Sequence, residues 1–323
     1  MVDMSIRSNL DRRPRCRVLL MLALSACGGT ARSDSAQVDP VPHAREIRVV
    51  PLRGVRDLRE SSAAAASRRQ PSVVFTIDDS GNSATLFALD TSGADRGAWR
   101  VTGASNTDWE SLSFGPCENP SRDCLYIGDT GDNRGTRPSR AIYRFAEPKA
   151  SGARDTVRAE KLRYVYADRP HDVEAMYVAR NGDIFLITKR PLLDSARRLR
   201  PALVFSLPAR AWRDGEQVVA QLVDSLPIVP GAKPLMVITD AALSADGRHL
   251  VVRTYVQAYV FATDSVTGRI NQSIAPRVCE LAPLGEPQGE GVTWLTNSGR
   301  LAFTSEGRAQ PLRLASCELP RED

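Results

Sequence analysis

The sequence predicts an all-β fold assembled from repeats of one β-hairpin unit. Short runs of β-branched and aromatic residues recur from Glu46 onward, and no segment shows a long apolar period of 3.6 residues. Gly (22) and Pro (21) are frequent whereas aromatic residues make up only 6%, which favours many short strands joined by turns. The third and most informative observation is a repeat along the chain. Each copy consists of a carboxylate, an apolar run, a loop and a second apolar run.

The clearest copy of the unit spans residues 108–133, DWESLSFGPCENPSRDCLYIGDTGDN. Glu110 opens its first apolar run, and Asp129 follows the second. Two strands joined by a loop bring the start of the first beside the end of the second. We therefore expect Glu110 and Asp129 at the same edge of one hairpin.

Four further copies share this arrangement. Glu60 and Asp79 are nineteen residues apart, as are Glu110 and Asp129. Tight-turn pairs such as Asn181-Gly182 separate the two runs in the later copies. The copies open at Glu60, Glu174, Asp240 and Glu290, and their second runs end near Asp79, Lys189, Arg253 and Glu306.

Each unit adds further β-like runs, which gives four strands per unit, a pattern typical of a β-propeller. The fifth unit runs out after its third strand, at residues 311–314. Residues 47–52 can supply the missing strand, so that pairing of the N- and C-terminal strands closes the ring and removes exposed edges. We predict five four-stranded blades. Six blades remain the alternative, because the third and fourth units are long.

The N-terminus predicts a targeting signal over residues 1–26. Five arginines precede an apolar run of nine residues, which is too short to cross a membrane as a mature helix. The run ends in Leu24-Ser25-Ala26-Cys27 and resembles a bacterial lipoprotein lipobox. The resemblance implies cleavage before Cys27 and acylation of that cysteine, palmitate included. A plain secretory signal with a chance cysteine is the alternative.

Gly28 after the cysteine resembles the sorting pattern of outer-membrane lipoproteins. We therefore expect a protein of the cell envelope, anchored to the outer membrane by the lipid on Cys27 and facing the periplasm or the exterior. Residues 27–45 are rich in Gly, Ser, Ala, Asp and Pro and predict a flexible tether. The propeller then occupies residues 46–320.

Charge and cysteines narrow the possible functions. Removal of the signal lowers the net charge from +5 to about +2, so no nucleic-acid footprint remains. Outside the cytoplasm the remaining cysteines can be oxidised. Cys117 and Cys124 flank a hairpin loop and predict a disulfide, whereas Cys279 and Cys317 either pair or remain buried thiols. With three His and no CxxC, a zinc site is not expected.

Four segments carry a resemblance to a protein family. They are DWESL…YIGDTGDNR, HDVEAM…TKR, ITDAALSADGR…VVRTY and PQGEGV…TSEG. They resemble secreted bacterial β-propeller proteins that are grouped with TolB-like or esterase-like propellers, over residues 50–315. The resemblance implies the fold and no particular reaction. Residues 63–66, four alanines, depart from the Gly-Leu-Ala expected there.

The repeats predict a charged mouth of the central channel, which the first strand of each blade lines. We expect Glu110, Glu174, Asp240 and Glu290 as candidate metal ligands. Clustered acids need a cation, a basic partner or raised pKa values, and Ca²⁺ accepts several carboxylates in loose geometry. The alternatives are carboxylates that accept backbone N–H groups of neighbouring blades, or solvated acids. The candidate ligand-binding residues at this mouth are Glu60, Asp79, Lys189, Arg253 and Glu306.

Two functions follow from this mouth. The first is binding of a small-molecule ligand or protein partner. The alternative is a Ca²⁺-dependent hydrolase of an ester, lactone or phosphoester, with Asp129 or His171 as general base. No GxSxG motif supports a serine nucleophile, and propellers host both classes, so enzymatic activity stays open. Residues 129–133 resemble a Ca²⁺ loop in composition but also fit a turn held by Asx hydrogen bonds.

Overall fold

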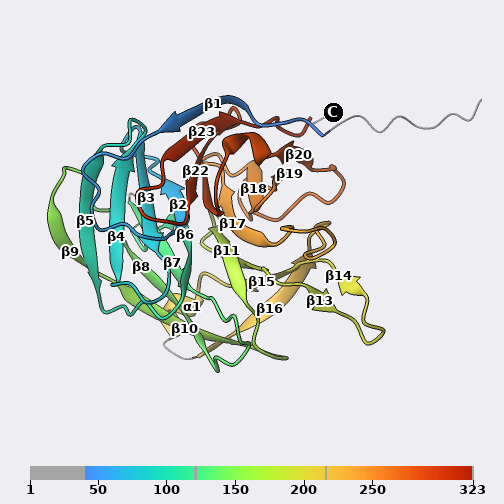
Figure 1. The fold of residues 1–323 in the computed structure, drawn as a ribbon. Coiled ribbons are helices and arrows are strands. Elements are labelled where there is room, and N and C mark those ends of the chain that lie inside the picture. The colour runs from blue at the N-terminus through green and yellow to red at the C-terminus, as the bar shows by residue number, and fades with distance from the viewer. Residues whose placement is uncertain (1–40, 120–121, 215–216, 322–323) are drawn as a thin grey trace, which may run out of the picture. The chain divides into compact units, whose positions relative to one another are not determined.

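The computed structural model describes residues 41–119, 122–214 and 217–321. The predicted signal, the lipidation site at Cys27 and the first part of the predicted tether lie outside these residues. The described chain is almost entirely β-structure arranged around a centre, and the all-β propeller prediction is confirmed (Figure 1). In the described ranges, no helix combines the length and apolar character that a membrane span requires.

Most strands within the described ranges can be divided by their antiparallel pairing into groups of four, which we number as blades 1 to 5 in chain order for reference, although blades 2 and 3 belong to one eight-stranded sheet. Blade 1 contains β2 (Ser61–Ala66), β3 (Val73–Asp78), β4 (Thr85–Asp90) and β5 (Asp95–Thr102). Blade 2 contains β6 (Trp109–Pro116), β7 (Asp123–Asp129), β8 (Arg140–Ala146) and β10 (Glu160–Tyr166). Blade 3 contains β11 (Val173–Val178), β12 (Ile184–Thr188), β15 (Leu203–Leu207) and β16 (Val218–Ser225). Blade 4 contains β17 (Ile238–Leu243), β18 (His249–Thr254), β19 (Gln257–Ala262) and β20 (Arg277–Glu280). Blade 5 contains β21 (Gly289–Trp294), β22 (Arg300–Ser305), β23 (Leu312–Ser316) and β1 (Arg45–Val50).

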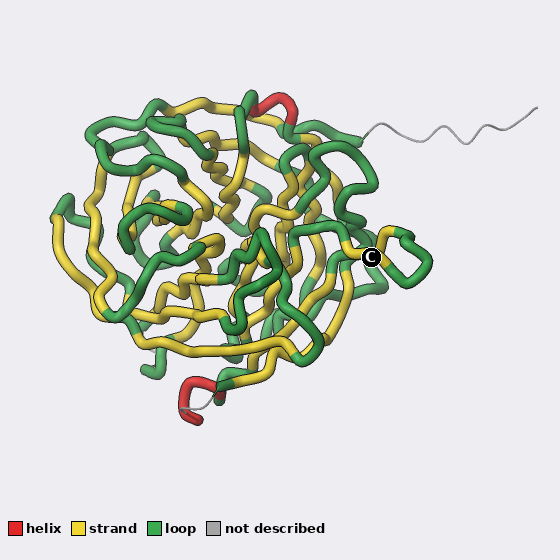
Figure 2. The backbone as a smooth tube through the Cα atoms, turned by 60° about the horizontal axis from the view of Figure 1, so that its bottom comes forward, coloured by secondary structure: helices red, strands yellow, loops and turns green. Residues whose placement is uncertain are grey.

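Further elements decorate the outer edges of the blades. The strand β9 (Arg154–Arg158) pairs in parallel with β5, and β10 pairs in parallel with β16, which joins blades 2 and 3 into one sheet. A small hairpin, β13 (Leu192–Leu193) and β14 (Leu199–Arg200), leaves blade 3. The short helical turns α1 (Ala211–Asp214) and η1 (Ala282–Leu284) lie at the periphery (Figure 2).

The innermost strands enclose the channel. Strand β2 contacts β6, β6 contacts β11, β11 contacts β17, β17 contacts β21, and β21 contacts β2. The first strand of each blade therefore lines the centre, as the repeats predicted. The four-alanine run lies in β2, where Ala63 and Ala64 are fully buried, so its small side chains suit close packing of inner strands.

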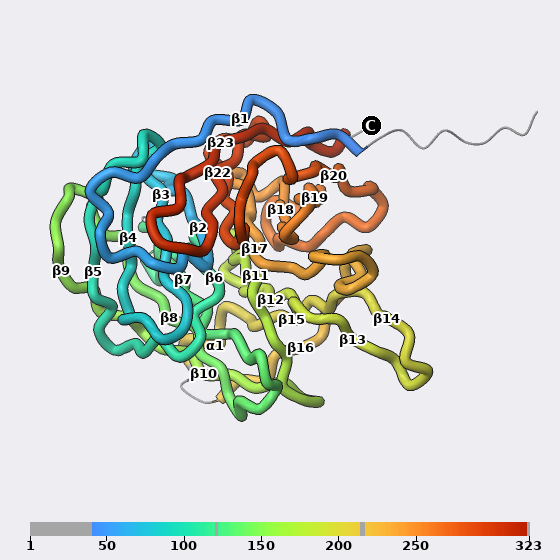
Figure 3. Tube along the Cα trace, in the orientation of Figure 1, coloured from blue at the N-terminus to red at the C-terminus, as the bar shows by residue number. Residues whose placement is uncertain are grey.

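The two ends of the described chain close the ring. Strand β1 pairs antiparallel with β23 and supplies the outer strand of blade 5, as predicted (Figure 3). The pairing begins earlier than residue 46. The amide of Ala44 donates to the Glu280 carbonyl at 2.9 Å, so residues placed in the predicted tether pair with β20 of blade 4. Closure therefore involves blades 4 and 5.

Side chains between neighbouring blades form the core. Phe75 of blade 1 packs against Phe114 of blade 2, with ring centroids 6.0 Å apart. The indole N–H of Trp294 in blade 5 donates to the Ala242 carbonyl of blade 4 at 2.8 Å. Trp294 thus contributes to packing between blades 4 and 5.

Candidate functional site

The register of the inner hairpins decides which acidic side chains reach the channel. Each inner strand carries one irregularity near its start, where residues on that strand have no partner on the second strand. Glu110 occupies this position in β6, between Trp109 and Ser111. Glu174 occupies it in β11, between Val173 and Ala175. Both side chains are buried. A bulge of this kind re-aims a side chain, which explains why two glutamates share one orientation.

The same register corrects the repeat alignment in blade 4. Thr239, not Asp240, occupies the unpaired position there, because Asp240 pairs with Arg253. A shift of one residue turns a side chain to the opposite face of a strand. In blade 5, Glu290 and Gly291 are both unpaired, so Glu290 keeps the position of Glu110 and Glu174.

Asp240 performs the structural role that was the alternative to metal binding. Its carboxylate is fully buried and accepts the backbone amides of Val292 at 2.8 Å, Ala241 at 2.8 Å and Ala64 at 3.4 Å. Burial raises the pKa of Asp240, and these amides oppose the rise. Asp240 therefore links blade 4 to blades 5 and 1, and its oxygens are occupied by those bonds.

The side chain of Arg253 also points into the protein interior. It is fully buried, donates to the Gly291 carbonyl at 2.7 Å and forms an ion pair with Glu286. Its guanidinium lies 5.3 Å from the ring of Phe303. The structure therefore does not present Arg253 at the channel mouth, although the repeats had aligned it with Lys189.

Three carboxylates converge at the entrance beside blade 2. Asp79 follows β3, Asp108 precedes β6 and Glu110 lies at the bulge of β6. One ligand atom from each lies within 4.8 Å of the others. We call these three residues the carboxylate triad. Asp108 was not among the residues singled out from the sequence. The available signal was its position at the start of the DWES segment, next to Glu110.

The backbone of residues 129–133 passes close to the triad. A Cβ atom on Gly131 would lie 2.5 Å from Asp108 Oδ2 and 2.8 Å from Glu110 Cγ. The amide of Gly131 donates to the Asp108 carbonyl at 3.2 Å. Glycine is therefore required here because the turn passes within contact distance of two triad side chains.

A second group of charged residues lies beside the triad. Lys189 Nζ contacts Glu174 Oε1, whereas Glu174 Oε2 is buried without a hydrogen-bond partner in the described structure. Glu290 accepts hydrogen bonds from the hydroxyl of Tyr255 and the amide of Gln288, each at 3.0 Å. Tyr255 and Gln288 were missed because neither stands at a repeated carboxylate position.

Like charges and burial shift the pKa values of these groups. Burial raises the pKa of Glu110 well above its ordinary range, and the charges of Glu174 and Asp79 raise it further. Burial also raises the pKa of Glu174 and of Glu290, against the attraction of Lys189. Asp108 reaches a pKa of about 6, chiefly through burial and then through Asp79.

Lys189 remains charged in this environment. Burial alone would lower its pKa, but the carboxylates of Glu174 and Glu290 outweigh burial and raise it. Its positive charge opposes the pKa rise of Glu110, Glu174 and Glu290. One ammonium group is outnumbered by these carboxylates, so they compete for protons or for a further cation.

Glu60 and Glu306 form the outer rim of this mouth. They pair as an isolated antiparallel bridge between blades 1 and 5, and Glu60 is exposed. Asn82 Nδ2 donates to Glu60 Oε2 at 2.9 Å. Partial burial and the charges of Glu290 and Asp79 raise the pKa of Glu306 to about 7. We call the triad together with Glu174, Lys189, Glu290 and Glu306 the acidic mouth.

Asp129, one of the two candidate bases, is engaged in holding the adjoining loop. It is buried, accepts the amide of Asp108 at 3.0 Å and pairs with Arg137 Nη2 at 2.7 Å. Asp132 holds the same loop by accepting the amides of Thr136 and Arg137, each at 3.0 Å. The carboxylates of Asp129 and Asp132 therefore hold the loop through hydrogen bonds to backbone amides.

His171, the other candidate base, packs away from the triad. Its Nε2 lies 3.1 Å from both carboxylate oxygens of Asp168, and its ring lies 4.8 Å from the rings of Tyr166 and Phe205. Burial lowers the pKa of His171, and Asp168 opposes that shift. In the described part of the chain, the ring of His171 therefore contacts Asp168, Tyr166 and Phe205 rather than a triad carboxylate.

The ligand set of the triad fits a hard divalent cation. Ca²⁺ binds carboxylate oxygens at about 2.3–2.6 Å, so two oxygens on one ion lie at most about 5 Å apart. The separations within the triad satisfy this limit. The unpartnered Glu174 oxygen adds a buried acceptor beside it. The set contains no imidazole or thiolate, which argues against zinc.

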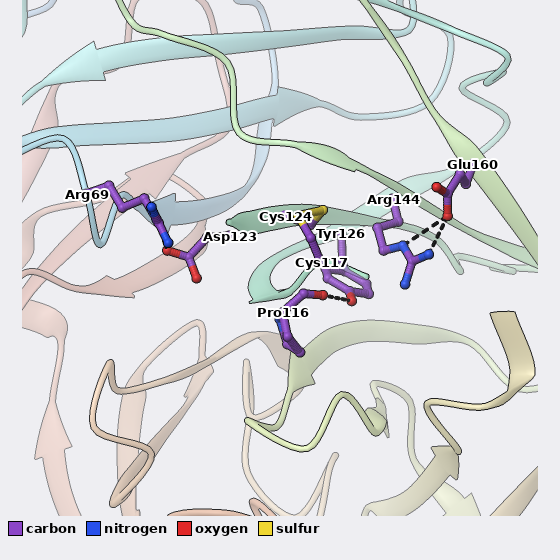
Figure 4. The surroundings of a disulfide bond; sticks show 8 residues. All are labelled: Arg69, Pro116, Cys117, Asp123, Cys124, Tyr126, Arg144 and Glu160. Carbon is purple, nitrogen blue, oxygen red and sulfur yellow. Dashed lines mark hydrogen bonds and ion pairs between the residues drawn. A yellow bond between two sulfur atoms is a disulfide. The ribbon is translucent and has the colours of Figure 1, made fainter. Parts of the chain in front are cut away.

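The predicted Cys117–Cys124 disulfide forms, at the opposite end of the β6–β7 hairpin from the triad (Figure 4). Of the two alternatives left open for Cys279 and Cys317, the structure shows the disulfide. Around the first disulfide, the Tyr126 hydroxyl donates to the Pro116 carbonyl at 2.6 Å, and Arg144 pairs with Glu160. The location agrees with a stabilising role for this disulfide rather than a role at the mouth.

No family model and no curated protein matches the sequence. Among solved structures, the chain is similar to a gluconolactonase from Xanthomonas campestris, with 14% identity, a TM-score of 0.43, and coverage of 86% of this chain and 98% of that chain. It is similar to the β-propeller domain of Cps50 (Swd1) from Myceliophteria thermophila, with 13% identity, a TM-score of 0.37, and coverage of 84% and 100%. A luciferin-regenerating enzyme has 8% identity, a TM-score of 0.44, and coverage of 85% and 97%.

Proposed function

We propose that this protein is a binding propeller whose acidic mouth takes up a divalent cation, Ca²⁺ by its ligand chemistry, and holds a ligand or protein partner through it. One observation carries the proposal. Asp79, Asp108 and Glu110 converge within 4.8 Å in a mouth where carboxylates outnumber the single neighbouring lysine. A bound Ca²⁺ offsets this repulsion and retains coordination positions for an oxygen of the ligand.

The test is metal quantification after equilibrium dialysis of the purified protein against Ca²⁺ or Mg²⁺ at pH 7.5. We expect about one Ca²⁺ per chain, and a large loss of Ca²⁺ in Asp108→Asn. Asp155→Asn, which removes an exposed carboxylate from β9, is the matched control and keeps the metal. Absence of bound Ca²⁺ in the parent protein, or equal binding in Asp108→Asn, would overturn the proposal.

A second candidate function is hydrolysis of an ester, lactone or phosphoester, and one observation favours it. Glu306 is half-buried at the rim, and a pKa of about 7 suits a general base near neutral pH. The bound cation would polarise the substrate oxygen. Glu306 here takes the role of general base in place of Asp129 and His171, because those two side chains bond to Arg137 and Asp168. A panel of these substrates tests it: any turnover that persists in Glu306→Gln does not use this base.

The envelope location belongs to the same proposal. Its support is the lipobox-like segment that ends at Cys27, together with the two disulfides, which suit an oxidising compartment. Metabolic labelling with a palmitate analogue tests it. Labelling of the parent and none of Cys27→Ser is the expected result. The location proposal fails if the parent takes up no label.

A further inference from the structure

The channel has a cavity at the end opposite the acidic mouth. Its volume is about 220 Å³. It is lined by the later residues of the inner strands, which include Ala65, Phe114, Leu243 and Trp294. These positions lie beyond the bulges, on the side where each inner strand ends. Since a strand rises about 3.3 Å per residue, Phe114 lies roughly 13 Å along β6 from Glu110.

The wall of this cavity is completed by a rigid turn that follows β2. The Ser67 hydroxyl oxygen accepts the amides of Arg69 at 3.1 Å and Gln70 at 2.7 Å. The Gln70 side chain donates to the Pro148 carbonyl at 2.9 Å and accepts the Ala150 amide at 2.8 Å. The turn between β2 and β3 is therefore held against blade 2 by bonds at both ends.

Arg68 stands on this turn and lines the cavity. Within the described residues it makes no hydrogen bond or ion pair, whereas its neighbour Arg69 pairs with Asp123 at 2.7 Å (Figure 4). Burial lowers the pKa of Arg68, Asp123 partly offsets this, and Arg180 adds to the lowering. A guanidinium stays charged at neutral pH, so its donors are available in a site that already disfavours an uncompensated charge.

The remaining walls set the character of a partner for Arg68. Leu112, Phe114, Leu243 and Trp294 give the cavity apolar walls, and Ser113, Thr293 and Asn297 add polar groups. A dry apolar cavity of about 150 Å³ is large enough to hold benzene, so this volume admits a ring with a small substituent. One guanidinium matches one singly charged, planar group bidentately. A dianionic phosphate would place more charge beside these walls than Arg68 neutralises.

We propose that this cavity binds a small organic carboxylate, with its carboxylate on Arg68 and its apolar body among the inner-strand side chains. The site is separate from the acidic mouth and does not depend on the cation. The clustered carboxylates at the acidic mouth also favour the opposite end of the channel for an anion. The two ends of one channel therefore accept ligands of opposite charge.

Saturation-transfer difference NMR and calorimetry on the purified protein test this proposal with three probes: benzoate, neutral benzamide of the same shape, and inorganic phosphate. We expect benzoate to bind and both other probes to bind at least tenfold more weakly. Arg68→Gln should weaken benzoate binding about 10- to 100-fold, the range for loss of a charged hydrogen-bond partner. Arg163→Gln removes an exposed charge from β10 and should leave binding unchanged.

Arg68→Lys distinguishes bidentate hydrogen bonding from charge, because lysine keeps the positive charge but lacks the planar guanidinium that binds a carboxylate through two donors. We expect an affinity between those of the parent and Arg68→Gln. A thermal melt like that of the parent establishes that each variant is folded. The proposal fails if benzoate does not bind, if benzamide or phosphate binds as tightly, or if folded Arg68→Gln binds benzoate like the parent.

Discussion

Replacement of Glu110 by Gln should change the stability of the protein in opposite directions with and without Ca²⁺. The substitution preserves shape and removes one charge from the carboxylate triad. Two unit charges 4.8 Å apart repel by about 3.5 kcal/mol at an effective dielectric constant of about 20. Partial protonation of the triad relieves some of this repulsion. We therefore expect metal-free Glu110→Gln to be about 1–3 kcal/mol more stable than the parent at pH 8.

Addition of Ca²⁺ should reverse the order. A ligand at 100 times its dissociation constant stabilises a protein by about 2.7 kcal/mol. At about 2–4 °C per kcal/mol, this raises the Tm of the parent by about 5–10 °C. Glu110→Gln lacks a ligand oxygen with negative charge and should show little Ca²⁺ shift at the same concentration.

Differential scanning calorimetry at pH 8, in chelator and in Ca²⁺, measures both effects. Asp155→Asn is the control, and it should follow the parent in both buffers. A lower Tm of Glu110→Gln in chelator would mean that Glu110 is a favourable internal acceptor and that the triad is not under repulsion. An equal Ca²⁺ shift in parent and variant would place the cation elsewhere.

Three other predictions address the pH dependence of stability, the turn at Gly131 and the contacts that Asp240 makes between blades. Folding raises the pKa of Asp108 to about 6 and that of Glu306 to about 7, so the protonated side chains favour the folded state; this contribution is complete below the unfolded pKa, near pH 4, and is lost as pH rises towards 7. The Tm of the metal-free protein should therefore fall between pH 5 and 8. A Tm that rises over that range would contradict these pKa directions. Gly131→Ala should lower Ca²⁺ affinity at least about tenfold in calorimetric titration, because the new Cβ displaces two triad side chains; an unchanged affinity would show that the turn does not shape the triad. Asp240→Ala should cost about 1–3 kcal/mol by urea unfolding, since the buried amide of Val292 loses its acceptor. Ca²⁺ binding to the folded variant should stay at the parent's level, and a loss of Ca²⁺ binding would restore Asp240 as a ligand.

The sequence by itself determined the propeller, because its evidence is local and repeated. Hairpin turns, paired apolar runs and the residues at their ends depend on neighbours in the chain. The inner position of the four alanines, the closing strand β1 and the Cys117–Cys124 disulfide followed from the same pattern. Each of these predictions needed only the order of the strands along the chain, because in a propeller that order determines the position of a strand within its blade.

Only the tertiary structure decided which acids meet. A one-residue difference in the position of the bulge placed the Asp240 carboxylate against backbone amides of the neighbouring inner strands, but kept Glu110, Glu174 and Glu290 at the mouth. Side chains alternate between the faces of a strand, so the spacing of repeats along the chain does not fix the face when a bulge adds a residue. Asp108 entered the triad for a related reason: a turn of blade 2 folds back over it at Gly131, a contact between segments that no repeat encodes.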